Sequence, residues 1–265
     1  MKSKVVKIFM LLTCLTFLLS LLGGCVNGCA NTTPPAQYEE REVGDFVVHF
    51  YADYCQIKGT TEQGNSKRFL VIPEYIDGVR VESVGFYSLS GVLDMVPTDL
   101  SRPEIKSDVL EKVYFESNIK MQPDSFASFN CPNIKKVLYP SVEINPYVLR
   151  RDGYTVYYPH KIYDNNERNE IGTERANVSY YYNYENAEND GYYWIDDCDY
   201  GEEIEFIPPE PTREGYEFGG WYKEPECINK WDFDFDTLPV EKTETVDNVA
   251  EQIVYQETIL YAKWI

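Results

Sequence analysis

The stretch REGYEFGGWYKEPECINKWDFDFD, residues 213–236, decides the fold of the C-terminal part of the chain. It carries seven aromatic residues among three glycines, and at its end Trp231, Phe233 and Phe235 alternate with aspartates. Such alternation is typical of a strand with one buried and one solvated face. We therefore expect residues 231–236 to form a strand. Its three carboxylates could also attract calcium, but a calcium site needs more oxygen ligands, so a solvated acidic face is favoured.

The residues around this stretch continue the β pattern. Upstream, NVSYYYNYENAENDGYYWIDDCDYGEEIEF (residues 177–206) predicts aromatic strands with turns at 189–191 and 200–201, and a further strand through Ile204 and Phe206. Downstream, LYAKW (residues 260–264) predicts a closing strand. Between them, residues 240–259 form an insert in which the spacing of Val246, Val249 and Ile253 is compatible with a short helix.

These signatures resemble the Listeria-Bacteroides repeat, the internalin B-repeat family. The family is marked by PTREGYxFxGWY, WDF and a closing LYAKW, which stand here at residues 211–222, 231–233 and 260–264. The resemblance implies a small β-grasp-like domain over residues 176–265. It also implies an extracellular interaction or spacer module without catalysis, of the kind found in secreted and surface-anchored proteins.

A second pattern recurs in the first half of the chain. The apolar residues of LEKVYF (residues 110–115) return in IKKVLY (residues 134–139) after a shift of 24 positions, and Leu70 and Ile72 fit the same strand phase. A period of 20 to 29 residues with a short apolar strand is typical of a leucine-rich-type solenoid, whose units are too small to bury their apolar faces alone. Residues 43–51 predict one more strand.

These units resemble the BspA-type leucine-rich repeats of bacterial surface proteins. IPEYIDGVRVESVG (residues 72–85) is similar to the family's opening unit, and FNCPNIKKVLYPS (residues 129–141) to its Cys-Pro step. The resemblance covers residues 69–140 and implies that Cys131 is an interior residue at a turn. We expect a leucine-rich-repeat-like domain over residues 43–158, followed by a polar connector at 159–175.

A small concave sheet of such repeats would expose alternate strand residues to a partner. The charged strand positions are Glu111, Lys112, Lys135 and Lys136. The sequence leaves two interpretations of these four residues open: they contact a partner, or they are merely solvated.

The amino terminus predicts export. Residues 1–24 contain three lysines and then an apolar run, residues 8–22, of 15 residues. That run is shorter than the ~20 residues of a membrane-spanning helix, which favours a signal peptide. Leu22-Gly23-Gly24-Cys25 resembles the lipobox of bacterial lipoproteins, in which the cysteine receives diacylglycerol. The resemblance implies a lipid anchor at Cys25, a polar tether over residues 25–42, and a location on the outer face of the bacterial cell membrane. An ordinary signal peptide is the alternative.

Charge and cysteine content restrict the partners and the chemistry. The net charge of −20 repels phosphate backbones, so we expect no nucleic acid partner, whereas a cationic partner stays open. Free thiols are expected in the exported part of the chain, with a bridge between Cys198 and Cys227 as the alternative. We expect no cofactor and no metal, because His49 and His160 are the only histidines and stand in no ligand spacing.

The sequence thus predicts a mainly β protein, a short leucine-rich-repeat solenoid followed by a small β-grasp-like domain, with no catalytic residue. Its predicted function is a membrane-anchored extracellular lipoprotein that presents interaction or adhesion modules to a protein or glycan. The alternative is a carbohydrate-binding surface module, because exposed aromatic rings can stack on sugars. The candidate contact residues are Tyr182, Tyr184, Tyr193 and Trp194, for which packing in the domain core is the competing interpretation.

Overall fold

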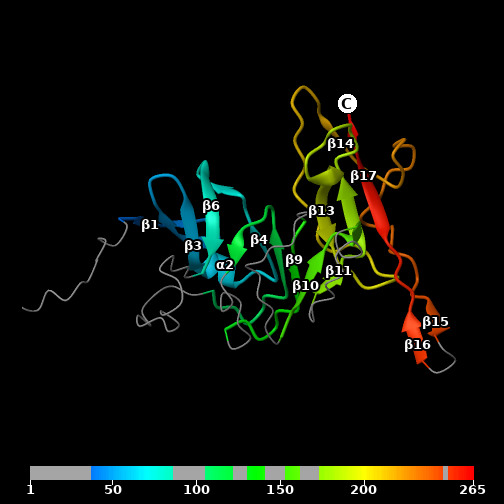
Figure 1. The fold of residues 1–265 in the computed structure, drawn as a ribbon, viewed down its shortest axis with the longest axis horizontal. Helices are drawn as coiled ribbons and strands as arrows, with labels where there is room; N and C mark the ends of the chain where they lie inside the picture. Colours follow the sequence, from blue (N-terminus) through cyan, green and yellow to red (C-terminus); the bar gives the residue numbers. More distant parts are fainter. Residues whose placement is uncertain (1–36, 86–104, 122–129, 141–152, 162–172, 247–249) are drawn as a thin grey trace, which may run out of the picture. The chain divides into compact units, whose positions relative to one another are not determined.

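Figure 1 shows the computed structural model of the chain, which describes residues 37–85, 105–121, 130–140, 153–161, 173–246 and 250–265. Residues 38–265 form one compact unit. The described residues are mainly β-strand with almost no helix, as the sequence predicts. Cys25, residues 1–24 and most of the predicted tether lie outside the described ranges. Within those ranges, none of the helices has the length and apolar composition of a membrane span.

A six-stranded sheet opens the described chain. Its path runs β1 (Glu39–Val43), β2 (Phe46–Phe50), β3 (Cys55–Thr60), β6 (Val79–Val84) and β5 (Tyr75–Ile76), and β8 (Lys120–Met121) also pairs with β6. The sequence predicts one strand over 43–51, but the chain turns between β1 and β2 because Gly44 adopts a φ of 56°. The short α2 (Glu62–Asn65) follows β3. Strand β1 begins inside the range that the sequence assigns to the tether.

Five parallel strands form the second sheet, which we call the parallel ladder. They are β4 (Phe69–Ile72), β7 (Lys112–Phe115), β9 (Lys136–Leu138), β10 (Thr155–Tyr158) and β11 (Thr173–Arg175), paired in chain order. Val113 lies opposite Val137, which confirms the predicted shift of 24 residues, and Leu70 lies opposite Val113. Strand β11 lies within the predicted connector, so the ladder extends further along the chain than the repeats read from sequence.

Alternate ladder residues enter two different cores. Leu70, Val113 and Val137 are buried in the first core, which also contains Val48 and Ile57 of the six-stranded sheet. Tyr114 and Leu138, which point to the opposite ladder face, are buried in the second core. That core consists mainly of residues from the C-terminal part of the chain. Both ladder faces are therefore covered by other parts of the same chain, as is usual for parallel sheets.

The C-terminal sheet has four strands in the order β13 (Tyr192–Asp196), β12 (Val178–Tyr181), β17 (Thr258–Trp264) and β14 (Phe218–Tyr222). The central pair, β12 and β17, is parallel, and both outer pairs are antiparallel. The turn between β12 and β13 contains the 3-10 helix η1 (Asn189–Gly191), where the sequence predicts a turn. In Figure 1 this sheet carries the labels β13, β14 and β17 near the C-terminus.

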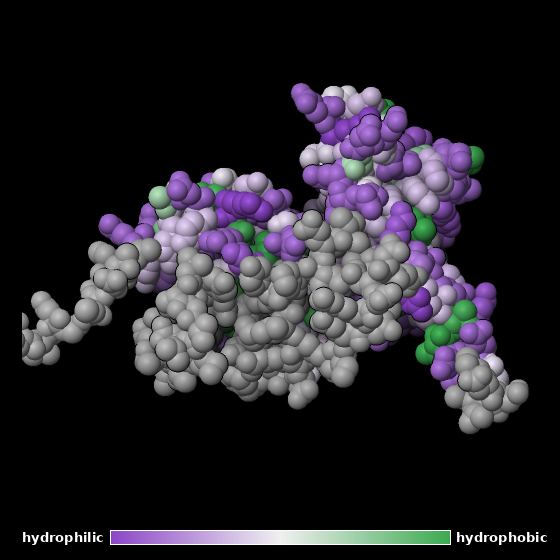
Figure 2. Space-filling view, in the orientation of Figure 1, coloured by the Kyte–Doolittle hydropathy of each residue, from purple (hydrophilic) through white to green (hydrophobic). Residues whose placement is uncertain are grey.

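The insert does not form a helix. Strands β15 (Thr243–Val246) and β16 (Ala250–Ile253) pair as an antiparallel two-stranded hairpin, whereas the sequence left a short helix open for these residues. Three apolar positions are too few to establish a helical period, and the cross-strand pairing of β15 with β16 decides the conformation. Hydrophobic surface is visible on this hairpin in Figure 2, and Ile253 is 58% exposed.

Two further strand predictions are wrong. Residues 231–236 form a turn, because the amide of Asp234 donates to the side chain of Asp232 and the amide of Asp236 donates to the Asp232 carbonyl. Aspartates favour such local hydrogen bonds over strand pairing. Phe235 is therefore 81% exposed, while Trp231 is buried. Ile204 and Phe206 lie outside any strand, although Ile204 is buried in the second core.

Candidate functional site

Trp194 is not an exposed ligand-stacking residue. Its ring is 2% exposed and lies 5.6 Å from the ring of Tyr114 and 6.2 Å from that of Phe206. The expectation of a contact aromatic at this position is wrong, because the indole faces the parallel ladder. A pattern of aromatic residues in a strand cannot show which side another part of the chain will cover.

The other three predicted aromatics are half-buried. Tyr182 lies between Tyr184 and Tyr193, with ring centroids 5.7 and 5.2 Å away. Burial raises the pKa of Tyr182 and of Tyr193, so both hydroxyls stay neutral at physiological pH. Those hydroxyls are already used, since Tyr182 donates to Glu188 and Tyr193 to the carbonyl of Pro209. Tyr182 and Tyr193 therefore stabilise the domain, whereas Tyr184 lines the pocket described below.

Tyrosines from all four C-terminal strands stand in register, and we call them the tyrosine row. Tyr181 lies opposite Tyr192 on one side and Tyr261 on the other, and Tyr261 lies opposite Tyr222. Because side chains alternate along a strand, Tyr181, Tyr222 and Tyr261 point away from the buried Tyr180, Trp221 and Ala262 beside them. These three are half-buried, whereas Tyr192 is buried.

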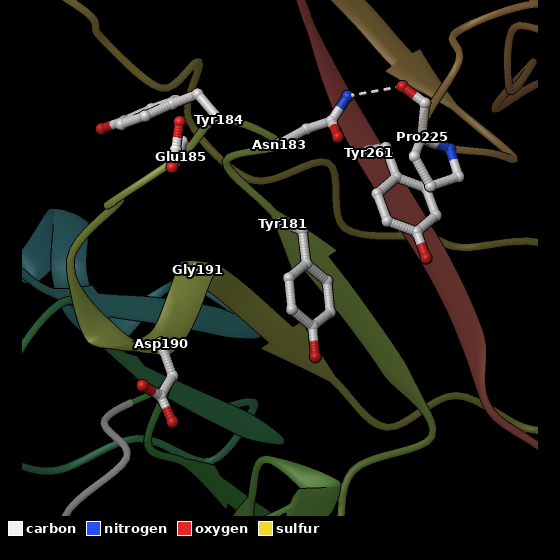
Figure 3. A pocket seen from close by; sticks show the side chains of 8 residues that line it. All are labelled: Tyr181, Asn183, Tyr184, Glu185, Asp190, Gly191, Pro225 and Tyr261. Atoms are coloured by element: carbon white, nitrogen blue, oxygen red, sulfur yellow. Dashed lines mark hydrogen bonds between the residues drawn. The ribbon is translucent and has the colours of Figure 1, made fainter.

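A pocket of about 470 Å³ lies at one side of this row. We call it the tyrosine pocket; it is lined by Tyr181, Asn183, Tyr184, Glu185, Asp190, Gly191, Pro225 and Tyr261. Figure 3 shows the rings of Tyr181 and Tyr261 side by side with their faces turned the same way, and the side chains of Glu185 and Asp190 on the other side. The pocket thus combines an aromatic wall with a carboxylate wall, an arrangement typical of sites for small polar ligands.

Local backbone conformation holds the pocket open. Asn183 and Asp190 have φ values of 56° and 54°, which asparagine and aspartate tolerate better than most residues. The amide side chain of Asn183 donates to the carbonyls of Pro225, at 2.9 Å, and Ala262, at 3.1 Å. It therefore ties the end of β12 to β17 and to the loop after β14. At Gly191 a Cβ atom would lie 3.4 Å from the ring of Tyr181.

The pocket carries negative charge and neutral hydroxyls. Burial raises the pKa of Tyr181 and of Tyr261, so both phenols are uncharged at pH 7. The exposed ammonium of Lys161 lies 5.7 Å from the Tyr181 ring centroid. The guanidinium of Arg213 lies 4.3 Å from the ring centroid of Tyr184, so two carboxylates and two cations lie at or near the pocket.

The described residues contain no group of three or more His, Cys, Asp or Glu side chains arranged to hold a metal ion. The two histidines lie apart: His49 Nε2 is 2.7 Å from Glu40, and His160 Nδ1 is 3.6 Å from Glu257. Cys131 is fully buried, as the resemblance implies, and burial raises the pKa of its thiol to about 11. Cys198 and Cys227 are both free, so the alternative of a bridge between them is wrong.

Lys112 and Lys136, two of the charged ladder positions, have partners within the chain. Lys112 Nζ lies 3.1 Å from the fully buried carboxylate of Asp196, and Lys136 Nζ lies 2.6 Å from Asp197. The Tyr114 hydroxyl donates to Asp196 at 3.2 Å. Burial is the largest single influence and lowers the pKa of Lys112, but the charge and hydrogen bond of Asp196 together with the neighbouring Cys198 and Asp197 outweigh it, and the net shift of the pKa is upward. Neither a partner surface nor simple solvation describes Lys112 and Lys136, which join the ladder to the C-terminal sheet.

Residues 177–245 match the family model of the Listeria-Bacteroides repeat domain. The match covers the tyrosine pocket as far as Pro225, while Tyr261 of β17 lies beyond it. No match was found among curated proteins or among solved structures. The sequence signal for the pocket was the turn-forming run NYENAENDG, residues 183–191, but the contribution of Pro225 and Tyr261 depends on strand pairing across the sheet.

Proposed function

We propose that the chain is a membrane-anchored extracellular lipoprotein that presents non-catalytic interaction modules to a partner outside the cell. The observation that carries this proposal is the Listeria-Bacteroides repeat at residues 177–245, a surface-associated repeat. The net charge of −20 supports the choice of partner, since it disfavours nucleic acid and attracts cationic surfaces.

Two modules make up the extracellular part in this proposal. Residues 43–158 form a short leucine-rich-type solenoid, and the in-order parallel pairing of β4, β7, β9 and β10 supports it. Residues 176–265 form a β-grasp-like domain, supported by the strand order of the C-terminal sheet with its parallel central pair. The ladder face that could have received a partner packs against the second core, so the partner contacts other surfaces.

Lipidation at Cys25 would hold the protein on the outer face of the cell membrane. Feeding cells a radioactive fatty acid tests it: the wild-type chain should carry the label and Cys25→Ala should not. Cys29→Ala is the matched control, because it removes a cysteine four positions later and should leave labelling unchanged. Equal incorporation of the label into wild type and Cys25→Ala would contradict lipidation at Cys25.

Adhesion is tested on intact cells. Cells that display the wild-type chain should attach to a partner-bearing surface better than cells with Cys25→Ala, which should release the protein into the medium. Attachment that is the same for both would contradict the interaction role. Hydrolysis of a sugar or peptide by the full chain, lost on replacing one carboxylate, would overturn the non-catalytic assignment.

Glycan binding is a second candidate function, and the tyrosine pocket favours it. Of the aromatics that the sequence suggested for this role, Tyr184 lines the pocket, while Tyr181 and Tyr261 supply the ring faces. Rings set side by side in an open hollow are suited to the apolar face of a sugar.

A further inference from the structure

We propose that the tyrosine pocket binds one uncharged pyranose unit of a glycan chain, with the C–H face of the sugar stacked on Tyr181 and Tyr261. This inference rests on the second candidate function and names its site and ligand class. No part of it depends on lipidation at Cys25.

The stacking wall is already assembled. The rings of Tyr181 and Tyr261 have centroids 5.9 Å apart and planes inclined by 28°, so their faces are turned in roughly the same direction (Figure 3), and we call this pair of rings the platform. Strand pairing fixes that spacing, because the two residues lie opposite each other on the parallel strands β12 and β17. Tyr181 also contacts Tyr192, at 4.5 Å, which limits its freedom to rotate. A ligand therefore meets a platform that loses little side-chain entropy on binding.

The opposite wall supplies hydrogen-bond acceptors. Glu185 and Asp190 are exposed, and their carboxylates lie across the pocket from the platform. Sugar hydroxyls are donors, and hydrogen bonds to an ionised acceptor are stronger than those between neutral groups. The volume of about 470 Å³ lies within the range of small-molecule sites and exceeds what one stacked ring fills, so a chain can enter and leave the pocket.

Charge selects the class of sugar. Two carboxylates line the pocket, and the whole chain carries a net charge of −20, so sialic and uronic acids are repelled. Lys161 lies beside the Tyr181 ring and Arg213 lies over the Tyr184 ring, so these two cations weaken the attraction of the pocket for a positively charged amino sugar. An uncharged hexose or N-acetylhexosamine needs only the ring faces and the acceptors.

The tyrosine row gives the glycan a direction. Beyond Tyr261 the row continues to the half-buried Tyr222, over whose ring Lys263 Nζ lies at 4.9 Å. A second sugar unit leaving the pocket along the sheet would meet this ring next. We therefore expect an oligosaccharide to bind more tightly than the monosaccharide.

Binding is measured on the purified full-length chain by calorimetry and by saturation-transfer NMR. The probes are neutral oligomers of glucose and of N-acetylglucosamine, a sialylated oligosaccharide, and an oligomer of glucosamine. At least one neutral oligomer should bind, with saturation transferred mainly to the ring C–H protons, and the sialylated one should not. Tyr261→Leu should weaken binding at least tenfold, whereas Tyr261→Phe, which keeps the ring, should stay within threefold of wild type.

Matched controls separate stacking from folding. Phe235→Leu removes an exposed aromatic ring of the same domain outside the pocket lining and should leave affinity unchanged. Asp190→Asn keeps a side chain that tolerates the positive φ and should weaken binding several-fold without lowering the unfolding midpoint.

Three results would overturn the inference. Neutral-sugar binding that Tyr261→Leu leaves intact would place the glycan elsewhere and keep the second candidate function. Binding of the glucosamine oligomer alone would reduce the effect to charge attraction. Absence of binding to every probe would remove glycan recognition altogether, and the lipoprotein proposal would still stand on the fatty-acid label.

Discussion

Asp196 shows at the scale of one residue how the chain compensates a buried charge. Its carboxylate has no solvent exposure, yet it accepts hydrogen bonds from Lys112, Tyr114 and the amide of Asp197. An isolated buried carboxylate would cost several kcal/mol, so these donors are what make the position tolerable. The partners lie 82 and 84 positions earlier in the chain, which is why the sequence alone did not pair them.

Replacing Asp196 by Asn should destabilise the protein by about 3 kcal/mol, because it leaves the ammonium of Lys112 without its buried counter-charge. The measurement is the free energy of unfolding in urea. Asp199→Asn is the control: this carboxylate is exposed and three positions away, and its loss should change stability by less than about 0.5 kcal/mol. Equal midpoints for the two variants would show that the ion pair contributes nothing.

Two buried thiols should be inert in the folded protein. Cys55 and Cys131 have no solvent exposure, and burial raises the pKa of each to about 11. Thiols are reactive only as thiolates, and a pKa above the usual value keeps the proton on sulfur as pH rises to 8. The thiolate fraction at pH 8 should therefore be lower by about a hundredfold than in an unfolded chain.

Mass spectrometry after iodoacetamide treatment tests this, with urea-unfolded protein as the control. Both cysteines should be modified in urea and protected without it. Rapid modification of Cys131 in the native protein would contradict its placement at an interior turn.

Elements were predictable where periodicity and burial act together. The shift of 24 residues predicted the pairing of β7 with β9. Each repeat is too small to bury its apolar residues unless it stacks on the next repeat. The run WDFDFD shows the opposite case. Its alternation suggested a strand, but the Asp232 carboxylate accepts from the Asp234 amide and the Asp232 amide donates to the Asp236 carboxylate. These bonds close a turn, so local side-chain chemistry decided the conformation.

The candidate site was predictable only in part for a related reason. Tyr184 could be named from its aromatic, turn-rich surroundings, whereas Trp194 in the same region is buried against the ladder. Tyr261 stands 80 positions after Tyr181 in the sequence and meets it only through the parallel pairing of β12 and β17. Periodicity predicts which residues share a face, and it does not predict which strands become neighbours.

The β15–β16 hairpin should be dispensable for the fold. Its strands pair with each other in a separate two-stranded sheet, and a two-stranded hairpin adds little stability by itself. The amide of Val254 donates to the carbonyl of Lys242 at 2.7 Å, so the two residues that flank the hairpin are hydrogen-bonded to each other. Replacing residues 243–253 by Asn-Gly should give a tight turn and change the free energy of unfolding by less than about 1 kcal/mol.

Urea unfolding of the shortened chain provides the measurement, with Ile253→Thr in the intact hairpin as the control for the loss of one exposed apolar side chain. A drop of several kcal/mol in the shortened chain alone would mean that the hairpin supports the sheet beside it.

The compact unit of residues 38–265 should unfold as a single cooperative unit. The second core contains Tyr114 and Leu138 of the ladder together with residues such as Trp194 and Leu260, so neither part buries its apolar surface without the other. The ion pairs of Lys112 and Lys136 cross the same boundary.

Two probes report on the two parts separately. All four tryptophans lie after residue 190, whereas Cys55 and Cys131 lie in the first core. Tryptophan fluorescence and the exposure of these thiols should therefore show the same urea midpoint. Leu238→Ala sharpens the test, since Leu238 is buried among C-terminal residues and its truncation should cost about 2–5 kcal/mol. In a coupled molecule that loss lowers the midpoint of Cys131 exposure as much as that of fluorescence. A thiol midpoint that stays at the wild-type value while fluorescence shifts would show two independent domains, each stable without the shared core.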